Sequence, residues 1–229
     1  MLHAVDMLPA RSRGNSPVKK MLTLIIGRRR QGKTTLAYSL SLRSPTRVIF
    51  DPRGQFRTTD DILPDGGGLD ELLDTRSEII VQPREYVRTA FTEVCRAFAD
   101  WIEENPEETA VLLADEVLFI DTPNTDYPSL DRIIRFGNPE RVGVIMTAHR
   151  PGDISTDIRA IADYWCIFRT TQEHDLRVID QRCGSQVAEI VSKLDARQYV
   201  VWSDAEGIFT VKTDATKWKV NIERQSVSA

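Results

Sequence analysis

The segment MLTLIIGRRRQGKTT, Met21–Thr35, contains the strongest structural signal in the chain. An apolar run ends at Gly27, and the residues from Gly27 to Thr34 have the spacing G-x-x-x-x-G-K-[ST]. Glycines at the two fixed positions let the backbone curl so that its N–H groups face phosphate oxygens, and the start of the following helix adds its positive dipole end. The spacing therefore predicts a phosphate-binding loop between a strand and a helix.

This loop and the first turn of its helix predict how a nucleotide is held. Lys33 is expected to reach the β- and γ-phosphates, and Thr34 is expected to ligate magnesium. ATP and Mg²⁺ are therefore the cofactors that the pattern predicts. The three arginines occupy variable positions of the loop, where they either face solvent or contact DNA or a neighbouring subunit. The expected nucleotide-binding residues are Gly27, Arg28, Arg29, Arg30, Gln31, Gly32, Lys33, Thr34 and Thr35.

Short β-rich runs alternate with helical patterns along most of the chain. Strands are expected at 21–27, 46–51, 77–83, 109–116, 142–151 and 163–169, helices at 34–42, 85–104 and 173–182, and a terminal hairpin over 198–211. This alternation is typical of a parallel sheet covered by helices. We therefore predict an α/β fold of the RecA-like P-loop NTPase type, with a mostly parallel central sheet flanked by helices and a C-terminal β-hairpin.

Two carboxylates close the apolar run at 109–116. Asp115 is expected to hold magnesium through water, and Glu116 is expected to orient or deprotonate an attacking water molecule. A carboxylate directly after the magnesium ligand suits hydrolysis, because water needs a positioned base. The phosphate is therefore expected to go to water.

Composition and charge limit the class of protein. The chain has 229 residues, of which 41% are hydrophobic and 28% are charged, and this fits one sizeable domain. Its net charge of −4 conceals a basic end, because residues 1–35 contain eight Lys or Arg against Asp6 alone. We predict a basic, poorly ordered arm over 1–20, a single P-loop ATPase domain over 21–215 and a tail over 216–229.

Other features of the sequence argue against several kinds of site. No apolar run approaches the roughly 18 residues of a membrane span, and the start of the chain is too broken by polar residues for a secretory signal. The cysteines Cys95, Cys166 and Cys183 are odd in number and far apart, so neither disulfides nor a structural zinc site is expected. Loops are expected at 63–70 and 121–129, where Gly, Pro, Asn and Asp gather.

The sequence from about residue 20 to residue 203 resembles the FtsK/HerA superfamily of DNA-pumping ATPases. Within that superfamily it is similar to the small genome-packaging ATPases of membrane-containing, tectivirus-like viruses. VIFDPRGQF, residues 48–56, looks like the family's second strand, which ends in Asp51, and VLLADE, 111–116, looks like its acidic strand. VIMTAHRPGDIS, 144–155, is similar to the stretch where family members carry a polar sensor followed by Arg-Pro.

The resemblance implies two further catalytic residues. His149 takes the sensor position, where the family usually has Gln; it can report the γ-phosphate through a hydrogen bond, but it titrates, so activity is expected to fall in mild acid. Many members also place an arginine before this strand that reaches the ATP of the next subunit. The nearest ungapped position here is Asn138, which cannot act in this way, and Arg135 or Arg141 on either side of it is the candidate.

The function implied by the resemblance is a ring-forming motor that hydrolyses ATP to translocate double-stranded DNA into a capsid. Its expected partners are DNA bound independently of sequence, further copies of the chain, and capsid or portal-vertex proteins, in the host cytoplasm or at the virion packaging vertex. Candidate DNA contacts are the loop 121–132 and the region of Arg53 and Arg57. Three alternatives stay open: a filamentous-phage assembly or conjugation-type coupling ATPase acting on protein or single-stranded DNA, a small-molecule phosphotransferase, and a non-hydrolysing interaction subunit.

Overall fold

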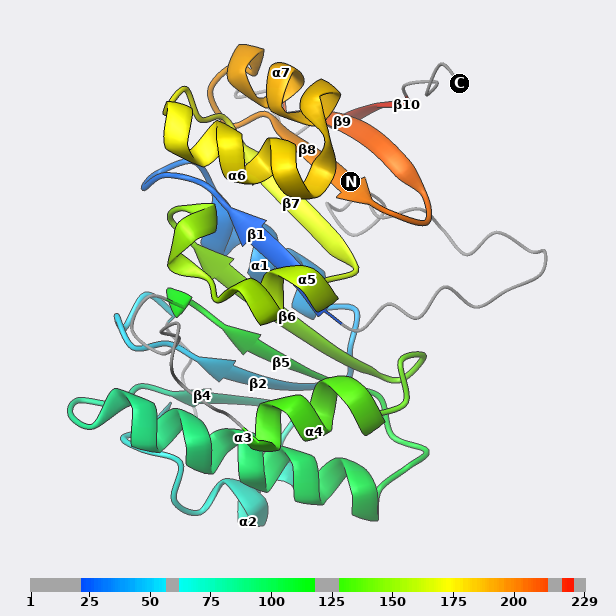
Figure 1. Ribbon diagram of the computed structural model, residues 1–229. Helices are drawn as coiled ribbons and strands as arrows, with labels where there is room; N and C mark the ends of the chain where they lie inside the picture. The colour runs from blue at the N-terminus through cyan, green and yellow to red at the C-terminus, as the bar shows by residue number, and fades with distance from the viewer. Residues whose placement is uncertain (1–21, 57–61, 118–127, 214–219, 225–229) are drawn as a thin grey trace.

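The computed structural model describes residues 22–56, 62–117, 128–213 and 220–224 (Figure 1). The strands are β1 (Leu22–Ile26), β2 (Thr46–Phe50), β3 (Ile62–Leu63), β4 (Glu78–Val81), β5 (Ala110–Ala114), β6 (Val142–Ala148), β7 (Tyr164–Phe168), β8 (Tyr199–Ser203), β9 (Gly207–Thr213) and β10 (Val220–Arg224). The helices are α1 (Lys33–Ser41), α2 (Leu69–Leu73), α3 (Val87–Glu104), α4 (Pro128–Phe136), α5 (Thr156–Ile161), α6 (Glu173–Cys183) and α7 (Ser185–Lys193), with a 3₁₀ helix, η3, at Pro151–Asp153.

All these strands belong to one sheet, in the order β10-β9-β8-β7-β1-β6-β5-β2-β4-β3. The seven strands from β7 to β3 run parallel, while β8, β9 and β10 add to the sheet in antiparallel fashion beyond β7. Every residue of β5 and of β7 is buried, as parallel strands covered on both faces require. The predicted α/β fold with a mostly parallel sheet and a C-terminal hairpin is therefore confirmed, with β8 and β9 forming the hairpin.

Two apolar cores lie on opposite faces of the sheet, because successive side chains of a strand point to opposite sides. Leu22, Leu24 and Ile26 of β1 belong to the larger core, whereas Ile25 belongs to the smaller one. Buried side chains of α2, α3, α4, α5, α6 and α7 complete the larger core, and those of α1 complete the smaller one. Figure 1 accordingly shows α1 behind the sheet and the other helices in front of it. The helices pack on the two faces of the sheet and leave the carboxyl ends of the parallel strands to the connecting loops.

Several elements are present that the sequence pattern does not predict. The predicted loop 63–70 is occupied at its ends by β3 and α2, because Leu69 and Leu73 are buried and stabilise a short helix after three consecutive glycines. Helices α4, α5 and α7 are also unpredicted. Strand β10, which lies within the predicted tail 216–229, pairs with β9. Residues 121–127 of the other predicted loop, and Arg57, lie outside the described residues.

Two further properties concern the described ranges. None of the helices in them is long and apolar enough to cross a membrane. The thiols of Cys95, Cys166 and Cys183 are buried and free.

Candidate phosphate-binding site

The loop between β1 and α1 has the curled backbone that its glycines predict. Gly32 directly precedes α1 with φ +104°, a conformation that other residues rarely adopt, and Arg30 also has a positive φ of 65°. Gly27 is needed for another reason, since a Cβ there would lie 2.6 Å from the Cβ of Phe168 at the end of β7. The loop therefore leaves β1 pressed against the neighbouring strand, and a side chain at Gly27 would displace it.

The side chain of Gln31 stabilises this loop through two hydrogen bonds. Its Oε1 accepts a hydrogen bond from the backbone N–H of Arg28 at 2.6 Å, and its Nε2 donates to the carbonyl of Arg169 at 2.9 Å. These contacts tie the loop to itself and to the residue that follows β7. The side chains of Arg28, Arg29 and Arg30 are exposed, within reach of solvent or of a bound molecule.

Lys33 begins α1 and is almost completely buried, with 5% of its surface exposed. Its Nζ donates to the carbonyl of Arg28 at 3.4 Å and lies 3.2 Å from Nδ1 of His149. Burial lowers the pKa of Lys33, an effect that the nearby carboxylates of Glu116 and Asp115 oppose. A buried ammonium is costly unless an anion compensates it, so this position favours an anionic ligand.

Asp115 follows β5 and is completely buried. Its Oδ1 accepts a hydrogen bond from the hydroxyl of Thr147 at 2.6 Å, and its Oδ2 accepts one from Nε2 of Gln55 at 3.1 Å. The hydroxyl of Thr34 lies 3.4 and 3.5 Å from the two carboxylate oxygens. Burial raises the pKa of Asp115 to about 6, and the hydrogen bond from Thr147 acts in the opposite direction.

The oxygens of Thr34 and Asp115 suit magnesium. Mg²⁺ prefers oxygen ligands, and nucleotide-binding proteins usually supply one or two side chains while phosphate and water fill the other positions. Within the described ranges there is no group of three or more His, Cys, Asp or Glu side chains able to hold a metal ion. The donors present therefore fit a magnesium ion that arrives with a triphosphate.

Glu116 lies next to Asp115 with a backbone φ of +58°, a left-handed conformation that costs a non-glycine residue roughly 1–2 kcal/mol. Its N–H donates to the hydroxyl of Thr147 at 2.9 Å, and this bond holds the unusual backbone. Oε1 lies 3.7 Å from Nη1 of Arg53. Oε2 lies 2.8 Å from Nε2 of His149, close but without hydrogen-bond alignment. The carboxylate of Glu116 is thus held between two basic side chains.

His149 is placed between Lys33 and Glu116. Burial lowers the pKa of His149, the charge of Lys33 lowers it further, and Glu116 opposes both effects. The imidazole is therefore neutral near neutral pH. When Nδ1 accepts from the Lys33 ammonium, the proton is on Nε2, which faces the Glu116 carboxylate. The ring thus connects the phosphate-binding lysine to the expected base.

Strand order explains why these residues meet. Lys33 follows β1, His149 follows β6 and Glu116 follows β5, and β6 lies between β1 and β5 in the sheet. The carboxyl ends of neighbouring parallel strands share one edge, so the three side chains lie in a row there. The strand that precedes His149 pairs directly with the strand that precedes Asp115 and Glu116.

Thr147 and Gln55 are partners of the two acids that the sequence pattern does not predict. Gln55 lies in the loop 51–56 after β2, which is shaped by the buried Asp51. The carboxylate of Asp51 accepts hydrogen bonds from the backbone N–H groups of Arg53 at 3.2 Å and Phe56 at 2.8 Å. This loop brings Arg53 and Gln55 to the acids. The loop-forming residues Asp51, Pro52 and Gly54 can be seen in VIFDPRGQF, but the sequence does not show in which direction the loop folds.

Comparison with solved structures agrees with this arrangement of strands, although no protein-family model and no curated protein sequence matches the chain. The genome packaging NTPase B204 from Sulfolobus turreted icosahedral virus 2, in complex with ATP-gammaS, matches with a TM-score of 0.68 and 16% identity over 90% of this chain and 98% of that one. B204, the DNA-packaging ATPase from Sulfolobus turreted icosahedral virus, matches with a TM-score of 0.65 and 17% identity over the same shares. VirB4 of Thermoanaerobacter pseudethanolicus matches with a TM-score of 0.63 and 12% identity over 91% and 92%.

The chain has the P-loop NTPase fold. At these identities the likeness shows the fold alone, and the fold is the one that these packaging ATPases and VirB4 share. The site described above occupies the same edge of the sheet at which P-loop NTPases bind nucleotides.

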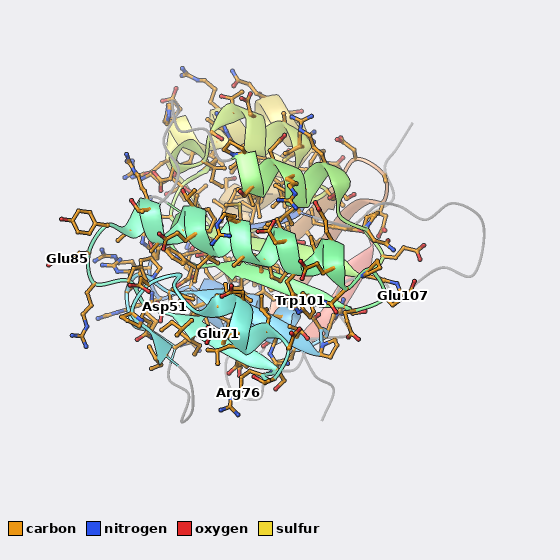
Figure 2. All side chains as sticks on the ribbon, turned by 90° about the horizontal axis from the view of Figure 1, so that it is seen from below. Asp51, Glu71, Arg76, Glu85, Trp101 and Glu107 are labelled. Atoms are coloured by element: carbon orange, nitrogen blue, oxygen red, sulfur yellow. The ribbon has the colours of Figure 1, made fainter. Side chains whose placement is uncertain are left out.

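The two candidate trans-acting arginines are both paired with acids of their own chain. Arg135, on α4, pairs with Asp131 one turn earlier. Arg141 precedes β6, and its guanidinium pairs with the carboxylate of Glu107 at 2.6 Å. Figure 2 shows Glu107 at the end of the molecule opposite Asp51, which follows β2 at the carboxyl edge. A catalytic role for Arg141 would therefore require a second copy of the chain.

Proposed function

We propose that this protein is an ATPase that works as a ring and translocates double-stranded DNA during the packaging of a viral genome. The observation that carries the proposal is the row of Lys33, His149 and Glu116 across the ends of β1, β6 and β5, with Thr34 and Asp115 beside it. A buried cation, a magnesium-type oxygen pair and a carboxylate base are the groups that hydrolysis of a nucleoside triphosphate needs.

Each residue has a defined task in this proposal. The loop Gly27–Thr35 encloses the phosphates, and Lys33 exchanges its contacts with the Arg28 carbonyl and His149 for phosphate oxygens. Thr34 and Asp115 hold the magnesium ion, which neutralises charge on the β- and γ-phosphates when it is bound. Glu116 accepts a proton from the attacking water.

His149 stands between phosphate and base, where it senses whether the γ-phosphate is present. An arginine of a neighbouring copy, Arg135 or Arg141, completes the charge around the phosphates. This would make activity depend on assembly.

DNA, ring assembly and packaging are supported by the fold match to B204, which is described as a genome packaging NTPase and a DNA-packaging ATPase. We propose sequence-independent contacts to DNA phosphates, capsid or portal-vertex proteins as further partners, and a location in the host cytoplasm or at the packaging vertex. Residues 1–20 act as a basic arm beside the ATPase domain 21–215, followed by the tail 216–229.

A second candidate function is favoured by the match to VirB4, which covers 92% of that chain. In this version the same site would serve a conjugation-type coupling ATPase that acts on a protein or on single-stranded DNA. A small-molecule phosphotransferase would use the loop as well, but it has less use for a carboxylate base for water.

One experiment separates these functions: ATP hydrolysis by the purified chain, alone and with long linear duplex DNA, single-stranded DNA or small phosphate acceptors. We expect duplex DNA to stimulate hydrolysis. Glu116→Gln is expected to keep nucleotide binding and to lose hydrolysis by about 10²–10⁴-fold, whereas the exposed Glu173→Gln is expected to behave as the parent protein. A chain that hydrolyses no nucleotide under any of these conditions would contradict the proposal, and stimulation by single strands alone would support the coupling ATPase.

A further inference from the structure

The turn between β4 and α3 presents an aromatic side chain to solvent. Tyr86 is 80% exposed, more than any other exposed large hydrophobic residue of the described ranges. Its backbone has φ +49°, which is unusual for a bulky residue, and its carbonyl accepts a hydrogen bond from the N–H of Ala90 at 3.0 Å as α3 begins. The exposed ring of Tyr86 contributes little to packing. A role in binding would explain why a strained backbone presents it to solvent.

Two arginines flank this tyrosine. Arg84 and Arg88 are exposed, and no described carboxylate lies within ion-pair distance of either guanidinium. Other exposed arginines differ, for example Arg96 and Arg177, which each pair with an acid one turn away. The first turn of α3 contains no acidic residue. We call residues 84–88 the arginine-tyrosine turn; Glu85 is its one acid.

The base of the arginine-tyrosine turn is firmly attached to the sheet. The backbone N–H of Gln82 donates to the carbonyl of Leu63 at 2.8 Å. Its side-chain Nε2 donates to Asp51 Oδ2 at 2.9 Å and to the carbonyl of Phe56 at 2.8 Å. Pro83 is buried. A binding element mounted on a rigid base loses little conformational entropy when a partner binds.

The turn belongs to a basic edge of an otherwise acidic molecule. Figure 2 shows Glu85 at the same end as Asp51 and opposite Glu107. In the described loops that follow the parallel strands, the exposed acids are Asp65 and Glu85, and Asp153 is half-buried. The exposed arginines there are Arg28, Arg29, Arg30, Arg53, Arg84, Arg150 and Arg169.

The size of this edge indicates the size of the ligand. The turn follows β4, which is four strands from β1 in the sheet order, or about 19 Å at the usual strand spacing. A mononucleotide in the phosphate loop does not reach so far. A ligand that contacts the turn together with the rest of this edge is therefore a polyanion.

We propose that the arginine-tyrosine turn binds the sugar–phosphate backbone of duplex DNA. The proposal rests on the proposed function, and it adds a contact outside the loop at 121–132 and the region of Arg53 and Arg57. Arg84 and Arg88 neutralise phosphates, while the Tyr86 hydroxyl donates to a phosphate oxygen and its ring packs on a sugar. Such contacts carry no sequence information, which suits a motor that moves along any sequence.

The test compares duplex binding by the full chain, loaded with a non-hydrolysable ATP analogue, in fluorescence anisotropy at several salt concentrations. The variants are Arg84→Gln/Arg88→Gln and Tyr86→Gly, and Arg96→Gln/Arg177→Gln is the matched control with the same change of charge. We expect the first variant to bind at least about tenfold more weakly at low salt, with a salt slope smaller by about 2, because each lost phosphate contact removes about 0.9. Tyr86→Gly relieves the positive φ, so weaker binding by it reflects the lost ring and not a damaged fold.

The remaining outcomes are distinct. ATP hydrolysis without DNA is expected to be unchanged in all three variants, and its absence in the parent protein would overturn the proposed function itself. If the parent hydrolyses ATP and binds duplex, but Arg84→Gln/Arg88→Gln binds duplex as well as the control does, the turn is not a DNA contact. Sedimentation shows whether the double variant still assembles. If it assembles poorly, but the assembled fraction binds DNA normally, the turn contacts a neighbouring subunit and not DNA.

Discussion

Single residues determine the chemistry of the site through burial of charge. Lys33, Asp115 and Glu116 are each at most 5% exposed, yet they lie at the edge of the sheet where a ligand arrives. Burial of these charged groups is costly in the free protein, and the cost falls when an anion and a divalent cation bind together. Two residues, Asp115 and His149, allow this idea to be tested by pH.

Asp115 is expected to make binding of magnesium nucleotide depend on pH. Its pKa is raised to about 6, so below pH 6 the free protein carries a proton that must leave before the carboxylate can face the metal. Apparent affinity should therefore fall by about tenfold between pH 7.5 and pH 5. Titration with a fluorescent ATP analogue measures this effect. Asp115→Asn is the control, since it removes the titration of this carboxyl and keeps that of the nucleotide and of His149, and an identical pH profile for it and the parent would contradict the assignment.

His149 is expected to act as a neutral sensor. Its lowered pKa keeps the ring uncharged at neutral pH, and the fall of hydrolysis that its protonation causes should appear only below pH 6.5. At saturating nucleotide, His149→Gln should retain activity and lose the part of the acid-dependent fall that His149 causes, while His149→Ala should hydrolyse ATP without coupling it to DNA movement. Steady-state hydrolysis and a DNA translocation assay, measured from pH 5.5 to pH 8, distinguish the variants. An alanine variant that translocates normally would refute the sensor role.

At the level of elements, β6 holds the site together because it separates β1 from β5 and supplies both Thr147 and the following His149. The hydroxyl of Thr147 donates to Asp115 and accepts from the N–H of Glu116, so one side chain of β6 fixes both acids at the end of β5. The loop 51–56 after β2 supports the acids from the other side through Gln55 and Arg53.

Thr147→Val tests this role of β6. The two side chains have nearly the same shape, but valine leaves the buried N–H of Glu116 without its partner and removes the shortest hydrogen bond of the Asp115 carboxylate, at a cost of about 1–3 kcal/mol in unfolding free energy. Hydrolysis should fall by at least about tenfold, because the left-handed backbone of Glu116 loses its support. Urea unfolding and steady-state kinetics measure the two effects. Thr147→Ser keeps the hydroxyl and should restore both, and a valine variant as active as the serine variant would disprove the role.

At the level of the whole molecule, Arg141 pairs with Glu107 at the end opposite Asp51, so a catalytic role for this arginine would need a second chain. We expect hydrolysis per chain to rise with protein concentration as the chains assemble, because an arginine supplied in trans contributes about 10³–10⁵ in rate in related phosphate chemistry. Mixing inactive Lys33→Ala chains with Arg141→Ala or Arg135→Ala chains should restore activity for the arginine that acts in trans. A dilute monomer with full activity would contradict this expectation.

Local features of the fold could be predicted from the order of residues alone. The spacing from Gly27 to Thr34 predicted the phosphate loop, the buried run before Asp115 predicted the acidic strand, and the alternation of apolar runs predicted the parallel sheet. The curved loop, the buried strand and the parallel sheet are present in the structure, because loop curvature and strand burial depend on residues that are neighbours in the chain. The short helices α2 and α4 were not predicted from the sequence. They are stabilised by leucines and an isoleucine that pack against elements distant in the chain.

Which residues meet at the site depends on how distant segments pack together. The insertion of β6 between β1 and β5 places His149 between Lys33 and Glu116, and the folding of the loop after β2 brings Gln55 and Arg53 to the acids. The exposure of Tyr86 and the distance of Arg141 from the phosphate loop also follow from the arrangement of whole elements. Strand order and side-chain exposure are set by packing among segments far apart in the chain, and the pattern of residues within one segment does not contain that information.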